Sequence, residues 1–247
     1  MTIISIINQK GGTGKTTTSI NLGSALSKLD KKVLLVDIDS QGNLGYSLGL
    51  DESKTISDVF QKDIEINQVI QEREGMDIIP SDIRLVDIEL SLAELSNRHT
   101  ILNKLFGTLS SSYDCVLIDC PPSLSILSLN ALYASDYVII PMQMEVLSLQ
   151  GLDQITQTIS KIKNGYGKEL KILGILPVMV DRRRKLSEEI KAYIKENYEV
   201  KIFRSVIRNN VRASESPSFG QSVITYSPKS NSAKDYIAFA NEIVELI

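Results

Sequence analysis

Residue types that build metal centres and disulfide frameworks are scarce in this chain of 247 residues, which has one histidine, two cysteines and no tryptophan. A single imidazole cannot supply a histidine-based metal centre, and His99 precedes an apolar helical stretch, so it is expected at a surface or boundary position. Cys115 and Cys120 are not spaced as CxxC and would point to opposite faces of a strand. They are therefore expected to be buried thiols without metal or redox function.

Long hydrophobic runs and linker-like segments are also missing. No stretch is long enough to cross a bilayer, and no charged region precedes a hydrophobic one at the start of the chain. No repeat, low-complexity tract or Pro/Gly/Ser-rich linker marks a boundary. These absences predict a cytoplasmic protein in which residues 1–247 form a single domain.

Apolar β-forming runs alternate with helical patterns along the whole chain. Many of the runs, such as Val33–Val36, are continuous rather than alternating, which is typical of strands covered on both faces. The predicted fold is therefore α/β, a doubly wound and mostly parallel sheet flanked by helices. Strands are expected at residues 3–8, 33–38, 76–80, 113–119, 136–141, 171–179 and 200–206, and helices at residues 15–29, 82–95, 99–110, 124–134, 148–164, 185–197 and 232–246.

A glycine-rich octet, KGGTGKTT, lies between the first apolar run and the first helical stretch. A strand that feeds such a loop into a helix directs backbone N–H groups and the positive end of the helix dipole at one small volume, where phosphate oxygens bind. Lys15 would reach the outer phosphates, and the Thr16 hydroxyl would bind the accompanying Mg²⁺. The predicted nucleotide-binding residues are Lys10, Gly11, Gly12, Thr13, Gly14, Lys15, Thr16 and Thr17.

The octet departs from the general P-loop pattern at its start. The first glycine of GxxxxGK[ST] would fall on Gln9, and the next residue is Lys10. Lys10 and Lys15 together carry more positive charge than one triphosphate site needs. We therefore expect Lys10 to serve a site other than its own.

Two predicted strands end in aspartate, at the edge of the sheet where ligands of such folds bind. Asp119 follows four apolar residues and is expected to hold Mg²⁺ through water, together with Thr16. Asp39 lies just beyond the other strand and is the candidate for orienting or deprotonating the attacking water, and Gly42 would allow its loop to move. Asp37, on the same strand face as Asp39, would act one step further out, on a lysine or a metal-bound water. The expected catalytic residues are Lys10, Lys15 and Asp39.

These segments resemble the ParA/MinD family of dimerising ATPases. The octet is similar to its deviant Walker A motif, KGGxGK[ST], and the sequence DIDSQGN at residues 37–43 to the switch I segment of ParA/Soj proteins. Residues 113–124 resemble the Walker B and switch II region, and residues 141–152 the PxQxE…LEGL stretch. Residues 210–220 are similar to the NVRxxEAPSxG segment beside the base. The resemblance spans nearly the whole chain.

The resemblance implies an ATP- and Mg²⁺-dependent, slow and partner-stimulated ATPase of the short ParA/Soj kind, without an N-terminal DNA-reading domain. ATP would drive sandwich dimerisation, with Lys10 reaching the partner's nucleotide and Glu145 near the nucleotide and the interface. Asn209 and Asn210 would lie beside the base, although this chain reads IRNNVR where the family has IPRNVR. The absence of an NKxD tetrad favours adenine. A ParB-like activator and a role in chromosome or plasmid partition are implied as well.

Charge is segregated along the chain, although the net charge is only −3. Residues 161–234 hold 16 Lys and Arg against 7 Asp and Glu. A basic face of this size suits salt-sensitive, sequence-independent binding to DNA phosphates, and two such faces would join in a dimer. A nucleoid-associated protein is therefore expected. The candidate DNA contacts are Arg182, Arg204, Arg208, Lys229 and Lys234.

A MinD-like ATPase that positions itself on a membrane surface is the alternative. Such proteins end in a basic amphipathic helix, which binds anionic lipid. The last residues here, 236–247, are apolar on one face and acidic on the other, so this helix is expected to pack on the sheet and no stable membrane association is expected. A metal-cluster carrier would need cysteines at an interface, and a simple ligase or kinase would not need Lys10.

Overall fold

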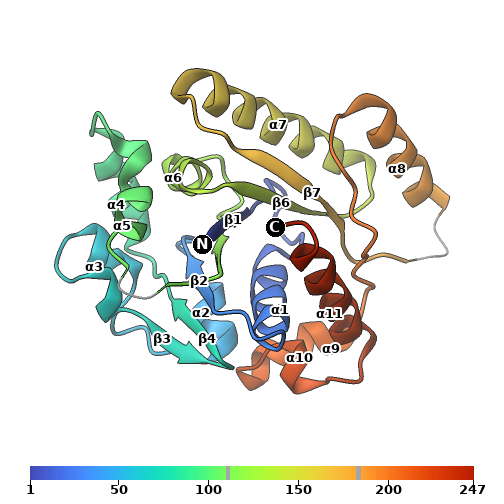
Figure 1. Ribbon diagram of the computed structural model, residues 1–247, viewed down its shortest axis with the longest axis horizontal. Coiled ribbons are helices and arrows are strands. Elements are labelled where there is room, and N and C mark those ends of the chain that lie inside the picture. The colour runs from blue at the N-terminus through green and yellow to red at the C-terminus, as the bar shows by residue number, and fades with distance from the viewer. Residues whose placement is uncertain (110–111, 182–184) are drawn as a thin grey trace.

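The computed structural model describes residues 1–109, 112–181 and 185–247 and confirms the doubly wound α/β fold (Figure 1). One seven-stranded sheet has the order β3-β4-β2-β5-β1-β6-β7. All neighbouring strands are parallel except β3 and β4, which form an antiparallel hairpin at one edge. The strands are β1 (Thr2–Ile6), β2 (Val33–Asp37), β3 (Gln71–Arg73), β4 (Met76–Ile79), β5 (Cys115–Asp119), β6 (Tyr137–Met142) and β7 (Lys171–Pro177).

Helices cover both faces of the sheet, and Figure 1 shows the two layers on either side of it. Three short 3₁₀ turns occupy residues 66–68, 98–100 and 216–219. The α-helices of the described residues are α1 (Lys15–Ser27), α2 (Asn43–Leu48), α3 (Ile56–Phe60), α4 (Leu85–Ala93), α5 (Ile101–Phe106), α6 (Ile126–Ala134), α7 (Val146–Tyr166), α8 (Lys185–Asn197), α9 (Val211–Glu215), α10 (Val223–Tyr226) and α11 (Asn231–Val244).

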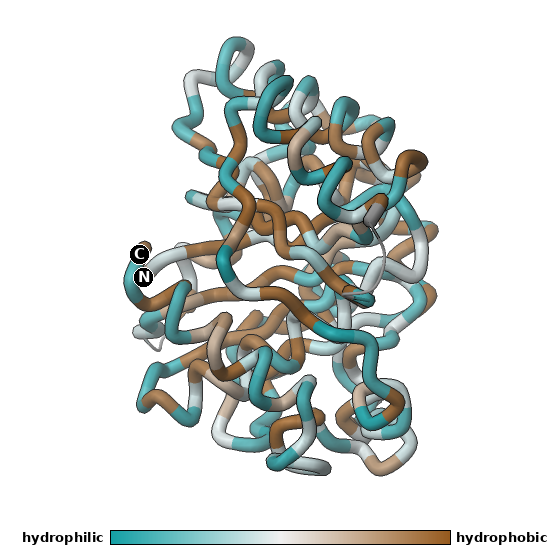
Figure 2. The backbone as a smooth tube through the Cα atoms, turned by 90° about the vertical axis from the view of Figure 1, so that its right-hand side faces the viewer, coloured by the Kyte–Doolittle hydropathy of each residue, from teal (hydrophilic) through white to brown (hydrophobic). Residues whose placement is uncertain are grey.

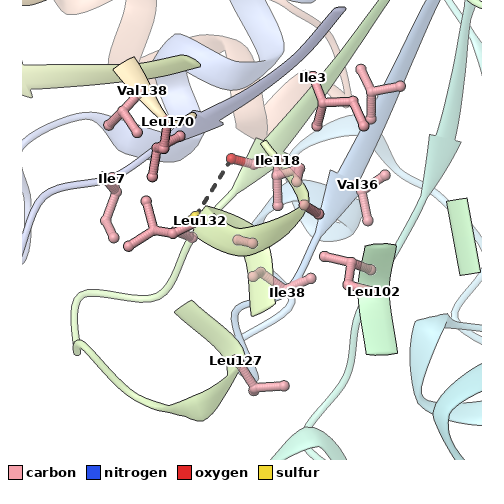
Figure 3. Packing of buried hydrophobic residues seen from close by; sticks show 14 of the residues in the cluster. Ile3, Ile7, Val36, Ile38, Leu102, Ile118, Leu127, Leu132, Val138 and Leu170 are labelled. Carbon is pink, nitrogen blue, oxygen red and sulfur yellow. Dashed lines mark hydrogen bonds between the residues drawn. The ribbon is translucent and has the colours of Figure 1, made fainter. Parts of the chain in front are cut away.

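Each face of the sheet has its own hydrophobic core. On one face, strand residues such as Ile118 and Val138 pack with side chains of α3 to α8, and Figure 3 shows part of this cluster, with Leu102 and Leu127 contributed by helices. On the other face, α1, α2, α10 and α11 supply the packing. The strands accordingly form a hydrophobic band through the middle of the molecule in Figure 2. Burial on both faces explains why the strand sequences are continuous apolar runs.

The two cysteines lie where the sequence predicts. Cys115 and Cys120 are 2% and 0% exposed and belong to the cores on opposite faces. Burial raises the pKa of Cys115 to about 12 and also raises that of Cys120, so both thiols stay protonated. The final helix also packs as expected, with Tyr236 and Phe239 buried in the second core.

The strand expected at residues 200–206 is wrong. The segment runs beside β7 but forms only an isolated bridge, between Ile175 and Ile202. The amides of Arg204 and Ser205 donate instead to the Glu242 carboxylate on α11, at 2.9 and 2.8 Å, which interrupts the ladder.

Other differences lie in short polar elements. The edge strand β3 has no apolar residue to mark it, and α2, α3, α9 and α10 have only four to six residues each. The helix predicted from residue 82 begins at Leu85, since the Asp82 carboxylate accepts a hydrogen bond from the Arg84 amide at 2.8 Å and forms a turn there. No helix in the described part of the chain combines the length and apolar composition needed to cross a bilayer.

Candidate nucleotide site

The glycine-rich loop forms an open cradle between β1 and α1. Gly12 and Gly14 have φ values of 70° and 74°, a left-handed conformation that glycine adopts without strain, and Gly14 caps α1. A Cβ atom at Gly11 or Gly12 would meet no heavy atom within 4 Å. The loop amides therefore face open space at a helix N-terminus, as anion binding requires.

Asn8 supports this loop and was not identified from the sequence. It is 2% exposed, its Nδ2 donates to Pro141 O at 2.7 Å, and its Oδ1 accepts from the Lys10 amide at 3.0 Å. The side chain thus ties the loop to the end of the neighbouring strand β6. The available signal was its position directly after a buried strand.

A cavity of about 490 Å³ lies over the cradle. Asp39 lines it from the loop after β2, and Ala213 and Pro217 line it from α9 and the 3₁₀ turn that follows. An adjoining cavity of about 160 Å³ shares Gly14 and Thr17 with it and contains Asn209 and Asn210, so the structure brings these predicted base contacts to the same region. The large cavity is lined by residues 11–17, Ile20, Asn21, Asp39, Gln41, Asn43, Tyr46, Ser47, Pro122, Ala213, Ser216, Pro217 and Gln221.

Lys15 is held in a largely dehydrated position. Its residue is 7% exposed, and burial lowers its pKa, while the nearby charges of Asp119 and Asp39 act in the opposite direction. No ion pair within the described residues involves Lys15. A buried ammonium group that faces a cavity without an ion-pair partner favours an anionic ligand.

Asp119 has one oxygen engaged and one not. Ser19 Oγ donates to Oδ1 at 3.0 Å, while Oδ2 is buried and makes no hydrogen bond with any described residue. Burial raises the pKa of Asp119 to about 6, although the Thr16 and Ser19 hydroxyls and Lys15 lower it. A buried carboxylate oxygen beside a threonine hydroxyl fits a water-bound Mg²⁺. The described residues form no cluster of three or more His, Cys, Asp or Glu side chains that could hold a metal ion.

Asp37 and Asp119 are direct neighbours in the register of β2 and β5. The Asp37 oxygens accept from the amides of Asp39 and Leu44, at 2.9 and 3.2 Å. Burial, followed by the charge of Asp119, raises the pKa of Asp37 well above its usual value. In this structure, Asp37 therefore fixes the loop that carries Asp39, and it does not line the large cavity.

Asp39 is the carboxylate that faces the cavity. It is 9% exposed, and its Oδ1 accepts from the Gln41 amide at 3.1 Å. Gly42 has a φ of 62° and caps α2 directly after this turn. The structure thus places Asp39 on the wall of the cavity, in a short loop with several backbone hydrogen bonds.

Lys10 does not line the cavity beside it. Its ammonium group donates to Glu145 Oε2 at 3.1 Å and to Gln143 Oε1 at 3.2 Å. Both partners lie in the segment that joins β6 to α7, so Glu145 contacts Lys10 rather than the cavity. The two exposed residues that follow, Val146 and Leu147, extend this surface with apolar side chains.

The candidate DNA contacts differ among themselves. Arg208 donates to Asp235 of α11 at 2.6 Å, and Arg204 donates to Glu245, directly after this helix, at 2.6 Å, so both arginines are ion-paired. Lys229 and Lys234 are exposed, and no ion pair within the described part of the chain involves them. Arg182 lies outside the described residues.

The sheet, the glycine cradle and the buried lysine define a P-loop nucleotide-binding protein of the deviant Walker A class. A family model described as an AAA domain matches residues 1–172. The chain is 40% identical to the sporulation initiation inhibitor protein Soj of Bacillus subtilis, with 98% of this chain and 97% of that protein covered. It is 39% identical to the chromosome partitioning protein ParA of Myxococcus xanthus, with 98% and 88% covered. The chain therefore belongs to the ParA/Soj family of chromosome-partitioning ATPases.

Solved structures extend the comparison. Cobyrinic acid a,c-diamide synthase from Mycobacterium smegmatis, crystallised with an ATP analogue and magnesium, superposes with a TM-score of 0.87 at 33% identity, covering 99% of this chain and 95% of that one. The septum site-determining protein MinD from Pyrococcus horikoshii, complexed with Mg-ADP, has a TM-score of 0.81 at 26% identity, covering 99% and 96%. The resemblance found in the sequence is thus confirmed at the level of family and fold.

Proposed function

We propose that this protein is a DNA-partitioning ATPase in which Mg-ATP binding drives sandwich dimerisation and non-specific DNA binding, and hydrolysis releases the DNA. Residues 1–247 act as one ATPase domain in the cytoplasm, associated with the nucleoid. ATP binds over residues 11–17, with its phosphates on the loop amides and Lys15 and its base toward Asn209 and Asn210. Solved relatives that contain an ATP analogue or ADP with magnesium support this ligand.

Hydrolysis depends on residues that bind the phosphates, the attacking water and the metal ion. Lys15 neutralises charge on the outer phosphates, and Asp39 orients the attacking water or accepts its proton. Thr16 and Asp119 would hold Mg²⁺, with Asp37 behind them, and the ion, when bound, neutralises the phosphate charge.

The observation that carries the dimer proposal is the position of Lys10. Its ammonium group lies outside the cavity of its own chain, on Gln143 and Glu145. Both members of the Lys10–Glu145 pair keep more than a third of their side-chain surface exposed, so the pair contributes at most about 1 kcal/mol. A partner's triphosphate, with several negative charges, can replace Glu145 as the group that Lys10 contacts. Lys10 then acts in the neighbouring site, where it stabilises charge that develops during hydrolysis.

DNA release is the last step of the proposed cycle. Two basic faces in one dimer bind a duplex by avidity, and hydrolysis separates them. The resemblance to ParA/Soj proteins implies a ParB-like activator, which would accelerate that step. Membrane-surface positioning is the weaker candidate, since the apolar face of α11 is buried in the core and the residue directly after the helix is the exposed Glu245.

Retardation of a non-specific DNA duplex by the full chain, with Mg-ATP, Mg-ADP or no nucleotide, tests the proposal together with sedimentation on anionic liposomes. We expect retardation only with Mg-ATP, no sedimentation, and loss of retardation in Lys15→Ala. Sedimentation with liposomes and no retardation would support the membrane candidate instead. Equal retardation in all three conditions would contradict nucleotide control.

A further inference from the structure

A buried serine outside the recognised motifs contacts the Asp39 loop. Ser81 lies between β4 and α4, and it is 0% exposed. Its Oγ donates to the carbonyl oxygen of Asp39 at 2.5 Å. The same carbonyl accepts from the Gly42 amide at 3.0 Å, so both of its acceptor positions are used, one from within the loop and one from Ser81.

Ser81 also packs against the other end of this loop. A Cβ atom at Gly42 would lie 3.0 Å from the Ser81 carbonyl oxygen, and Gly42 has a φ of 62°, which disfavours any other residue. The turn from Asp39 to Gly42 is therefore held at both ends by one residue of a different loop. Asp37 also holds this loop in place, because its carboxylate accepts hydrogen bonds from the amides of Asp39 and Leu44.

The segment that carries Ser81 is itself anchored on both sides. Before it, Pro80 O accepts from the Ile56 amide at 2.9 Å. After it, the Asp82 carboxylate accepts from Thr55 Oγ1 and pairs with Arg84 at 2.7 Å. Arg84 also binds Asp58 of α3 at 2.6 Å. Ser81 thus presents its hydroxyl from a braced segment, which a hydrogen bond needs if it is to fix a neighbouring loop.

We propose that Ser81 is a positioning residue for hydrolysis, which sets the direction of the Asp39 carboxylate toward the phosphate end of the cavity. The inference rests on the proposed role of Asp39. Ser81 does not touch the cavity, so it acts through the Asp39 carbonyl and the Asp39–Gly42 turn. Since a misplacement of about 1 Å can lower a rate about 100-fold, loss of one such bond would be visible in turnover.

Ser81→Ala tests this in the full chain, with Ser135→Ala as the matched control. Ser135 is equally buried, and its Oγ also donates to a backbone carbonyl, that of Ala131 at 2.8 Å. It precedes β6, however, and so lies at the amino ends of the strands, whereas Ser81 lies at their carboxyl ends. We expect Ser81→Ala to lower the turnover number of Mg-ATP roughly tenfold, with ATP affinity unchanged within about twofold. Ser135→Ala should change neither. Ser81→Cys, which fills a similar space with a weak donor, should lie between wild type and Ser81→Ala and serves if the alanine variant does not fold.

A second readout needs no nucleotide. Hydrogen exchange of the Gln41 and Gly42 amides should be roughly tenfold faster in Ser81→Ala than in Ser135→Ala, because both amides donate to Asp39, in the turn that Ser81 holds. Unchanged exchange together with wild-type turnover in Ser81→Ala would overturn the inference, and so would equal losses in both serine variants. Asp39→Ala distinguishes the role of Asp39 from that of Ser81. Wild-type turnover in Asp39→Ala would refute the role of Asp39 itself. An inactive Asp39→Ala together with a fully active Ser81→Ala would refute only the positioning role of Ser81.

Discussion

The carboxyl edge of the sheet and the outer face of α11 both gather charged side chains, but they balance those charges differently. At the sheet edge, Lys15 is buried without an ion pair among the described residues, and Asp119 keeps one buried oxygen without a hydrogen bond. On the face of α11, Arg204 and Arg208 are each paired with a carboxylate at 2.6 Å. A buried ammonium group without a direct ion pair and a buried carboxylate with an unused oxygen indicate a ligand, whereas arginines that the fold already pairs do not, by themselves, indicate DNA.

The largest expected effect is at the carboxyl edge of the sheet, where Asp39 faces the cavity. Asp39→Ala should lower ATP turnover by about 100- to 10,000-fold, because a general base or water-orienting group is lost, while ATP still binds within a few-fold. Phosphate release and ATP titration measure the two quantities. The exposed Asp63→Ala is the control and should behave as wild type. Normal turnover in Asp39→Ala would remove this residue from the mechanism.

Lys15→Ala should weaken ATP binding about 100-fold or more, since the buried cation that faces the phosphates is lost. Isothermal titration calorimetry with Mg-ATP measures the change. Lys54→Ala, at an exposed position between α2 and α3, removes an equal charge and should leave the affinity unchanged. Tight binding of ATP by Lys15→Ala would mean that the phosphates do not bind at this carboxyl edge of the sheet.

Substitutions around the outer face of α11 should change DNA affinity less. They compare cations that are ion-paired in the structure with cations that are not. The double variant Lys229→Ala with Lys234→Ala should lower the slope of log affinity for DNA against log salt by about 2, one for each lost phosphate contact. Asp235→Asn should raise DNA affinity a few-fold, because it releases Arg208 from its ion pair. Fluorescence anisotropy with Mg-ATP at several salt concentrations measures both. If Asp235→Asn has no effect while Arg208→Ala weakens binding, Arg208 contacts DNA in its paired state, and the comparison drawn above fails.

The smallest expected effect is on stability and its dependence on pH. Burial raises the pKa of Asp119 from 3.8 to about 6, so the folded, nucleotide-free protein binds a proton more readily than the unfolded chain does. Proton binding by Asp119 favours the folded state below about pH 4, and this stabilisation is lost as the pH rises through about 6. Asp119→Asn should therefore raise the melting temperature at pH 7.5 by a few degrees, and the difference should narrow toward pH 5. Thermal unfolding of both proteins across this range measures it, and a gap that widens on acidification would contradict the assigned burial.

The conformation of the glycine-rich loop could be predicted from the sequence, because its residues form one contiguous segment whose local geometry determines their position. Gly12, Gly14 and Lys15 need only the strand and helix that flank them. Asn8 and Ser81 were missed because their partners lie 42 or more positions away, in Pro141 and Asp39. Those contacts exist only after the sheet has assembled.

The same reason explains the errors around α11. Residues 200–206 have the composition of a strand, but Glu242 captures two amides of this segment from a position about 40 residues away. Arg208 reads as an available cation until Asp235 is placed beside it. Tertiary partners of this kind decide both strand pairing and charge, and no local pattern reports them.

The most direct test of the account is the molecular mass of Asp39→Ala with Mg-ATP, measured by light scattering at high protein concentration, with and without a second substitution, Lys10→Ala. We predict twice the 27.4 kDa of one chain for Asp39→Ala, and a single chain when Lys10 is also replaced or when ADP is supplied. A mass of 27.4 kDa for Asp39→Ala saturated with Mg-ATP would contradict the claim that Lys10 leaves Glu145 for a partner's triphosphate.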